Sequence, residues 1–219
     1  MPTDARILEI GCGVGMLWRD NRARIPVTWQ LTLSDFSLGM IQACATHLPS
    51  ATYLQADAQA IPFGDKYFDA VFANHMLYHV PDVSRAIAEI RRVLKANGKF
   101  YAATNGDAHL RELKTIVAEL LGHAIMPLVD ANVSKQFSLE NGAQQLAKSF
   151  VHVEHFDFDD ALVVTEVEPL VAYIMSGFMG KQLLHIEYEE SLRQFIADRM
   201  ARDGAIRITK STGLFIATN

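Results

Sequence analysis

Three glycines at alternate positions follow a short apolar run, and they are the first residues of the chain that could support chemistry. The run Arg6–Ile10 leads directly into Gly11, Gly13 and Gly15. Glycine is needed where φ is positive or where a ligand lies against the backbone. Backbone amides at the start of a helix can also hold the polar groups of a ligand. The turn is therefore a candidate pocket for an adenosine-bearing ligand. A tight strand-to-helix corner would need the same glycines, so the turn alone leaves both interpretations open.

The spacing of these glycines differs from the dinucleotide-binding fingerprint. That fingerprint places its third glycine three residues after the second. Met16 occupies this position here, and Gly15 comes one residue early. The spacing therefore does not suit a pyrophosphate turn, and it weighs against an NAD(P)-linked oxidoreductase.

Two acidic residues stand where strands two and three are expected to end. The carboxylate of Asp35 could accept hydrogen bonds from both ribose hydroxyls, and no arginine stands beside it in the sequence to bind a 2′-phosphate. Together with Ser37 it would equally cap the next helix. Asp57 and Ala58 could address an adenine edge, although a plain loop aspartate is the alternative for Asp57.

A histidine just past the fourth expected strand is the candidate general base. His79 would lie at the carboxyl end of the sheet, where open α/β folds bind ligands. The ordinary pKa of histidine also suits proton transfer near neutrality. A histidine that only shapes the pocket is the alternative. His75 and Tyr78 in the same turn, and Asn105 after the fifth strand, are candidates for contacts with the substrate.

The elements that must position these residues alternate along the first two thirds of the chain. The predicted strands cover residues 6–10, 27–34, 52–55, 70–73 and 99–104, and the predicted helices cover residues 38–48 and 84–94. Strands that alternate with helices predict an α/β fold with a doubly wound, mostly parallel sheet.

The pattern changes after Gly106. Residues 107–148 are predicted to be helical, and strand-like runs cover residues 151–158 and 162–164. Two further helices are expected near residues 166–175 and 188–202, before a hairpin of residues 205–209 and 213–218 around Lys210–Thr212. Without repeats or linkers, this predicts a single domain over residues 1–219. We expect its helical insertion, residues 107–148, to contribute to the pocket for the acceptor.

Composition and charge exclude several classes of protein. The formal net charge of −5 argues against a broad electrostatic grip on nucleic acid or anionic lipid. Two cysteines, Cys12 and Cys44, are too few for a disulfide scaffold or a multi-cysteine zinc site. No apolar run approaches the roughly 20 residues that cross a bilayer, and the N-terminus has no signal-peptide pattern. We expect a cytoplasmic monomer or homodimer that binds neither nucleic acid nor membranes.

Several motifs in order resemble those of class I S-adenosylmethionine-dependent methyltransferases. The resemblance is to the small-molecule branch with quinone C-methyltransferases and sugar O-methyltransferases. Its motifs are Glu9–Gly15, Asp35–Phe36, Ala56–Ala58, Ile61–Phe63, Phe68–Phe72, Leu77–Asp82, Arg92–Gly98 and Gly213–Ala217. The resemblance implies a Rossmann-like sheet of seven strands with an antiparallel last strand, and methyl transfer from S-adenosyl-L-methionine to a small-molecule acceptor. Family members usually carry one or two helices before the first strand, so we expect either a trimmed chain or another segment that closes the site.

The resemblance also implies roles for individual residues. The loop Gly11, Cys12, Gly13 and Gly15 would carry the methionine end of the cofactor, with Glu9 near its ammonium group. Asp35 would bind the ribose, Asp57 and Ala58 the adenine, and Asn74 would line the floor. Phe36 and Met40 would flank the adenine as apolar walls. In related sugar O-methyltransferases a histidine matching His79 is the proposed base.

The expected chemistry needs little from the protein beyond alignment. A sulfonium is already an activated methyl donor, and alignment of the reacting atoms can supply up to ~7–11 kcal/mol. No metal is required, and a base is needed only if the acceptor must lose a proton. Two alternatives stay open: an NAD(P)-linked Rossmann oxidoreductase, and a non-catalytic protein that binds S-adenosylmethionine.

Overall fold

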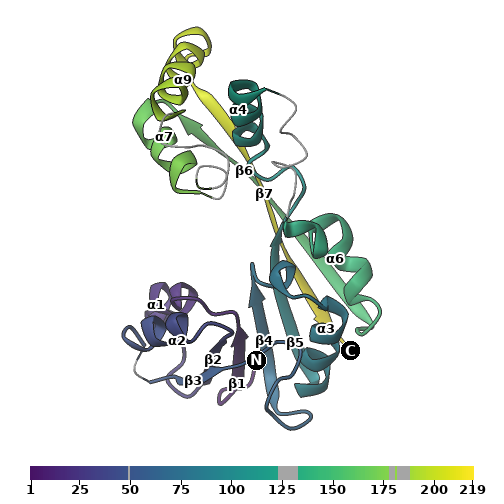
Figure 1. The fold of residues 1–219 in the computed structure, drawn as a ribbon. Coiled ribbons are helices and arrows are strands. Elements are labelled where there is room, and N and C mark those ends of the chain that lie inside the picture. The colour runs from purple at the N-terminus through teal and green to yellow at the C-terminus, as the bar shows by residue number, and fades with distance from the viewer. Residues whose placement is uncertain (49, 123–132, 178–180, 182–187) are drawn as a thin grey trace. The chain divides into compact units, whose positions relative to one another are not determined.

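The structure of the chain is a computed structural model, shown in Figure 1. The structure describes residues 1–48, 50–122, 133–177, 181 and 188–219. The chain divides into two compact units that both contain segments distant in sequence. Unit 1 comprises Met1–Gly106, Ser134–Asp157 and Gly213–Asn219, and unit 2 comprises Asp107–Val133 and Phe158–Thr212. Two compact units can belong to one domain, so a single domain over residues 1–219 stays a prediction.

Five parallel strands form the central part of unit 1. They are β1 (Arg6–Ile10), β2 (Gln30–Asp35), β3 (Thr52–Gln55), β4 (Phe68–Asn74) and β5 (Leu94–Asn105). They lie side by side in the order β3-β2-β1-β4-β5, with every neighbouring pair parallel. In this register Glu9 of β1 lies between Leu33 of β2 and Phe72 of β4. The carboxyl ends of β1, β2 and β4 therefore meet at one edge of the sheet.

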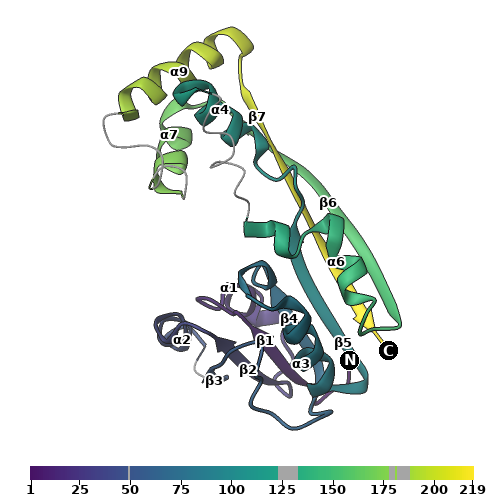
Figure 2. The ribbon, with the colours of Figure 1, turned by 45° about the vertical axis from the view of Figure 1, so that its right-hand side comes forward.

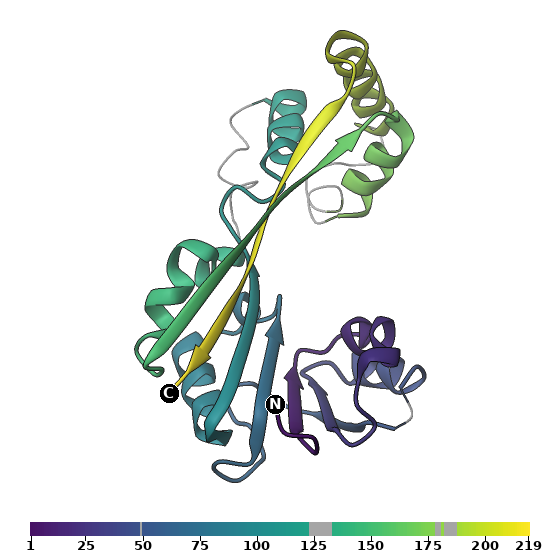
Figure 3. The same ribbon diagram turned by 180° about the vertical axis from the view of Figure 1, so that it is seen from behind.

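Two long strands complete the seven-stranded sheet. They are β6 (His152–Val164) and β7 (Ile206–Thr218), and the order continues as β5-β7-β6. Figure 3 shows the last strand of the chain running against β5, and the amide of Val151, just before β6, donates to the carbonyl of Thr218 at the end of β7. The doubly wound, mostly parallel sheet with an antiparallel last strand is thus confirmed.

The predicted C-terminal hairpin is wrong. The residues expected to form its turn, Lys210–Thr212, continue the extended backbone of β7. None of the three has a positive φ, which the tight turns of two-residue hairpins require. A β-branched threonine also favours extended backbone over a turn.

The helices of unit 1 cover two faces of the sheet with separate cores. On one face, α3 (Val83–Val93) and α6 (Leu139–Leu146) pack on β1, β4 and β5 through a cluster that includes Leu8, Val71, Ile87, Ile90, Phe100 and Leu146. On the other, α1 (Met16–Asp20) and α2 (Leu38–Ala45) contribute to a cluster with Ile7, Trp18, Leu33, Ile41 and Cys44. Leu8 and Ile7 lie on opposite faces because successive side chains of a strand alternate.

Side-chain caps fix where two of these helices begin. The hydroxyl of Ser37 accepts the amide of Met40 at the start of α2, and Asp82 accepts the amide of Arg85 at the start of α3. Such caps satisfy amides that have no partner within the helix. The short turn η2 (Leu77–His79) connects β4 to α3. The caps therefore set the ends of the loops that follow β2 and β4.

Unit 2 has a core of its own. Its helices are α4 (Arg111–Leu121), α7 (Val167–Ser176) and α9 (Glu189–Asp203), which bury Leu113, Ile116, Leu170, Ile174, Leu192 and Ile196 together with Ile206 and Ile208 of β7. The carboxylate of Glu112 accepts both the amide and the hydroxyl of Thr209, at 2.8 and 2.7 Å. These bonds join the start of α4 to β7.

The helical segment predicted over residues 107–148 is divided between the units. Its first part forms α4 in unit 2, whereas the turn η4 (Val133–Gln136) leads into α6, which belongs to unit 1. Residues 123–132 lie outside the described residues. The expected contribution of this segment to an acceptor pocket stays a prediction.

Helix α6 packs so closely on β7 that it has room only for glycine at one position. A Cβ atom on Gly142 would lie 2.6 Å from the ring of Phe215 and 3.1 Å from that of Phe137. We expect Gly142→Ala to lower the free energy of unfolding by about 1–3 kcal/mol, because the aromatic core must shift. Urea denaturation of both proteins measures the difference.

The matched control is Gly39→Ala in α2, where the nearest atom of the described residues outside the helix's own backbone is the hydroxyl oxygen of Ser37, 3.8 Å from a new Cβ. This exposed helical site should gain up to about 1 kcal/mol, since alanine favours helix over glycine. Equal effects of the two substitutions would contradict the packing described here.

Candidate functional site

The glycine loop after β1 has two glycines that pack against the protein and one that faces open space. Gly11, Gly13 and Gly15 all have positive φ, at 68°, 54° and 76°. A Cβ on Gly11 would lie 2.6 Å from the Cβ of Met76, and one on Gly15 would lie 2.5 Å from the Sγ of Cys44. At Gly13, no atom of the described residues other than Gly13 and its two chain neighbours lies within 4 Å of that position. A tight corner accounts for the outer two glycines, whereas the middle one leaves free space against the backbone.

Asp35 joins this loop to the start of α2. Its carboxylate accepts the amide of Gly13 at 2.9 Å through Oδ2 and the amide of Ser37 at 2.9 Å through Oδ1. The amide of Cys12 donates to the carbonyl of Ser34, also at 2.9 Å. Because an ionised carboxylate has about four lone-pair positions, two further donors can still be accepted. Asp35 and Ser37 thus both contribute to the start of α2, as the helix-capping alternative expects, whereas ribose binding by Asp35 stays a prediction.

Glu9 is a buried carboxylate close to the same loop. It is 3% exposed, and it accepts the indole N–H of Trp18 at 2.6 Å and the side-chain amide of Asn74 at 2.9 Å. Burial raises the pKa of Glu9 to about 7, the hydrogen bonds from Asn74 and Trp18 lower it, and the charge of Asp35 raises it further. The site therefore holds a group that changes its charge near neutral pH.

Asp57, in the loop after β3, is hydrogen-bonded to another residue of the same loop. Asp57 accepts the backbone amide of Gln59 at 2.8 Å and its side-chain amide at 3.0 and 3.1 Å. These hydrogen bonds, the backbone one foremost, lower the pKa of Asp57. Ala58 is buried in the core, and the carbonyl of Gln59 accepts the guanidinium of Arg85 at 2.9 Å. Contact between Asp57 and an adenine would have to replace the side-chain amide of Gln59.

The apolar side chains expected to flank an adenine are open to solvent. Phe36 is 75% exposed and Met40 is 45% exposed, and both follow Asp35 closely in the chain. Their exposure leaves apolar surface beside Asp35 that an adenine could contact.

The turn after β4 carries the three residues expected to face the acceptor. His75 is exposed and has a φ of 53°, and its amide donates to the carbonyl of Ala103 at 2.9 Å. Non-glycine residues in this conformation are uncommon and occur often at functional sites. The rings of Tyr78 and His79 lie 4.6 Å apart. Asn105 ends the neighbouring strand β5.

The two cysteines are buried and unoxidised. Cys12 is 8% exposed and Cys44 is fully buried, and neither forms a disulfide. Burial raises the pKa of both thiols, which keeps them protonated at neutral pH. Cys12 therefore packs as a small buried residue, as expected.

Two side chains that hold carboxylates of the site were not predicted from the sequence. They are Trp18, which donates to Glu9, and Gln59, which donates to Asp57. A signal for Trp18 does exist, because a tryptophan three residues after the last loop glycine would lie on the first turn of the next helix. No local pattern distinguishes Gln59 from a surface residue.

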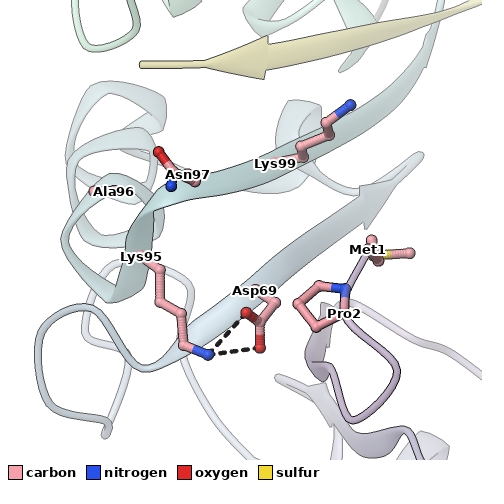
Figure 4. A pocket seen from close by; sticks show the side chains of 7 residues that line it. All are labelled: Met1, Pro2, Asp69, Lys95, Ala96, Asn97 and Lys99. Carbon is pink, nitrogen blue, oxygen red and sulfur yellow. Dashed lines mark hydrogen bonds and ion pairs between the residues drawn. The ribbon is translucent and has the colours of Figure 1, made fainter.

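A pocket at the other edge of the sheet is separate from this site. Its volume is about 470 Å³, and Figure 4 shows the ion pair of Lys95 with Asp69, at 2.7 Å, in a pocket that Met1 and Lys99 also line. Met1 precedes β1, Asp69 and Lys95 lie near the amino ends of β4 and β5, and Lys99 pairs with Ala70 near the start of β4. Open α/β folds bind ligands at the carboxyl ends of their strands, where the glycine loop lies.

The described residues hold neither a cluster of metal-ligating side chains nor a helix that could cross a membrane. In that part of the chain, no three His, Cys, Asp or Glu side chains gather in a way that could hold a metal ion. None of its helices is both long enough and apolar enough to span a membrane.

Several known proteins with similar sequences carry methyltransferase names. Residues 8–102, which hold most of this site, match the family described as methyltransferase domain. The chain is 29% identical over 129 residues to a demethylmenaquinone methyltransferase of Renibacterium salmoninarum, across 59% of this chain and 53% of that protein. It is 31% identical over 160 residues to a malonyl-[acyl-carrier protein] O-methyltransferase of Geobacter sulfurreducens, across 71% of this chain and 59% of that protein. The chain thus spans a little over half the length of these two relatives.

Solved structures share the fold at low sequence identity. A protein of Anabaena variabilis, described as a methyltransferase from an antibiotic biosynthesis pathway, matches 100% of this chain and 92% of its own with a TM-score of 0.70 and 16% identity. A phosphoethanolamine N-methyltransferase of Haemonchus contortus, solved with phosphomonomethylethanolamine and S-adenosylhomocysteine, matches 100% of this chain and 49% of its own with a TM-score of 0.58 and 19% identity. At these identities the likeness concerns the fold.

The raised pKa of Glu9 should appear in the pH dependence of stability. Between pH 4.5, the ordinary pKa of a glutamate, and about pH 7, Glu9 is protonated in the folded state but ionised in the unfolded state. Stability from this group is thus present at low pH and lost as pH rises towards 7. We therefore expect the unfolding free energy of Glu9→Gln to rise by about 3 kcal/mol relative to that of the wild type as pH increases from 4 to 8.

Urea denaturation across this pH range measures the difference, with the exposed Glu154→Gln as the control that should follow the wild type. A constant offset between Glu9→Gln and wild type at all pH values would contradict a pKa near 7.

Proposed function

We propose that this chain, whose residues 8–102 match the family described as methyltransferase domain, transfers a methyl group from S-adenosylmethionine to a small-molecule acceptor by in-line displacement. The observation that carries the proposal is one constellation at the carboxyl edge of the sheet. It combines a glycine loop with open space at Gly13, the Asp35 carboxylate bonded to that loop, and the buried carboxylate of Glu9.

The residues present fit this cofactor. Open space at Gly13 lets a ligand lie against the backbone, and Asp35 keeps lone pairs for two ribose hydroxyls. Phe36 and Met40 offer apolar surface for the adenine. Asp57 and Ala58 lie at the edge of the adenine once the side-chain amide of Gln59 has moved away from Asp57. When bound, the cofactor supplies a sulfonium-activated methyl group. The protein contributes alignment, which is worth up to ~7–11 kcal/mol.

Charge orients the amino-acid end of the cofactor in this proposal. Glu9 attracts its ammonium group, and the low polarity around a buried carboxylate strengthens such an attraction. Asn74 holds one oxygen of that carboxylate at 2.9 Å and forms part of the floor. Since the pKa of Glu9 is about 7, the attraction grows as pH rises through neutrality.

The acceptor approaches from the turn after β4 in this proposal. His79 is exposed and acts as the general base where the acceptor must lose a proton, while His75, Tyr78 and Asn105 contact the acceptor. The names of the two relatives, a demethylmenaquinone methyltransferase and a malonyl-[acyl-carrier protein] O-methyltransferase, support an organic acceptor that carries a quinone-type ring or a carboxylic acid.

Loss of the Asp35 carboxylate should weaken binding of the cofactor. Isothermal titration calorimetry of the wild type should detect binding of S-adenosylhomocysteine and no response to NADH. We expect Asp35→Ala to bind S-adenosylhomocysteine about 10- to 100-fold more weakly, because hydrogen bonds to a charged group are lost.

The matched control is Asp20→Ala, which removes an exposed aspartate paired with its neighbour Arg19 and should bind as the wild type does. Heat with NADH but not with S-adenosylhomocysteine would favour an oxidoreductase instead.

Replacement of His79 tests catalysis separately from binding. With a labelled methyl donor and a panel of phenols, quinols and carboxylic acids, we expect His79→Gln to lower turnover about 10²- to 10⁴-fold. Affinity for S-adenosylhomocysteine should stay within twofold of wild type, because His79 acts on the acceptor. Near-normal turnover would remove the assignment of His79 as the base.

A further inference from the structure

The short helix after the glycine loop has one residue that points into the protein. Met16 and Leu17 are 56% and 38% exposed, whereas Trp18 is 4% exposed. The helix begins directly after Gly15, and the amide of Arg19 donates to the carbonyl of Gly15 at 3.0 Å. Trp18 is therefore attached to the end of the loop through a single helical turn.

The indole of Trp18 closes a link from the end of the loop back to the strand before it. Its N–H donates to Oε2 of Glu9 at 2.6 Å, in a fully buried hydrogen bond between residues nine positions apart. The other carboxylate oxygen accepts the side-chain amide of Asn74 at 2.9 Å. Glu9 thus receives one donor from the helix and one from β4.

The orientation of the indole is fixed by an aromatic stack on β4 and β5. The ring of Trp18 meets Phe72 edge-on, with centroids 5.5 Å apart, and Phe72 stacks on Tyr101 at 4.7 Å. A phenylalanine at position 18 could keep the contact with Phe72, but it could not donate a hydrogen bond. Packing and hydrogen bonding at this position can therefore be separated by one substitution.

Neutral donors stabilise the charge of Glu9. Of the ionisable groups that act on it, Asp35 at the end of β2 opposes its ionisation. Cys12 of the loop and Cys44 of α2 are buried thiols, whose own pKa values are raised mainly by burial. No lysine or arginine forms an ion pair with Glu9 among the described residues. The balance between charged and neutral Glu9 therefore depends on the hydrogen bonds of Trp18 and Asn74.

We propose that Trp18 is a positioning residue for the amino-acid end of the cofactor: its indole N–H holds the Glu9 carboxylate in one orientation and in its charged form, so that the carboxylate attracts the ammonium group. The inference rests on the proposed function. It assigns to Trp18 a role that acts through Glu9 and that affects only ligands with an ammonium group.

Two ligands that differ in this group provide the test. S-adenosylhomocysteine carries the amino-acid tail, whereas 5′-methylthioadenosine has the same adenosine and thioether without it. In Trp18→Phe the lost donor raises the pKa of Glu9, so more of the protein has a neutral Glu9 at pH 7. We expect S-adenosylhomocysteine to bind about fivefold more weakly at pH 7 and within about twofold of wild type at pH 9. Binding of 5′-methylthioadenosine should stay within twofold at both pH values.

Two further variants separate this effect from a general loss of structure. Trp29→Phe replaces the other tryptophan, which packs against the same core, and it should leave both affinities unchanged. In Glu9→Gln the affinity for S-adenosylhomocysteine should no longer change between pH 6 and pH 8. Adding Trp18→Phe to Glu9→Gln should then have no further effect on the pH profile.

A measurement without ligand covers the case in which Trp18→Phe does not fold. The chain has two tryptophans, so its ¹H–¹⁵N spectrum contains two indole signals. The Trp18 signal of the wild type should titrate with a midpoint near pH 7, and in Glu9→Gln it should not. A Trp18 signal that is constant from pH 5 to pH 9 would overturn the proposal.

The outcomes distinguish this inference from the proposed function. Equal weakening of both ligands in Trp18→Phe would mean that Trp18 only supports the fold, and would overturn its positioning role while the proposed function stands. No binding of S-adenosylhomocysteine by the wild type would overturn the proposed function, and the role of Trp18 with it.

Discussion

A negative charge must be kept inside the protein, and the site is arranged around it. Water stabilises a carboxylate far better than a protein interior does, so burial raises the pKa of Glu9 to about 7. Trp18 and Asn74 offset part of that cost with hydrogen bonds. Because these donors come from α1 and β4, the carboxylate is held only when the helix, the loop and the central strands are all in place.

The parallel sheet brings the polar groups together. Glu9, Asp35 and Asn74 belong to three neighbouring strands, and the register that sets Glu9 beside Leu33 and Phe72 also aligns the ends of those strands. Asp35 then bonds to Gly13, so the loop is fixed from a second strand. Among the described residues, no side chain packs against the position that a Cβ of Gly13 would take, so the backbone there is open to a ligand.

The local sequence predicts the elements well and the contacts between them poorly. Strand periodicity and the residues that end each run predicted the parallel sheet and the place of Asp35 at the end of β2, because these features depend on neighbours in the chain. Trp18 and Gln59 were missed, because their partners Glu9 and Asp57 are set by packing and loop closure. The hairpin prediction failed because a strand that continues through Lys210–Thr212 depends on pairing with distant strands.

The central claim is that the glycine loop and Asp35 bind a nucleoside with an amino-acid tail. A crystal structure of the chain with S-adenosylhomocysteine tests it most directly. The account predicts ribose hydroxyls within hydrogen-bond distance of the Asp35 carboxylate, and the amino-acid tail along the backbone of Gly11–Gly15 with its ammonium group on the side of Glu9. A ligand bound elsewhere, or one whose ribose makes no contact with Asp35, would contradict it.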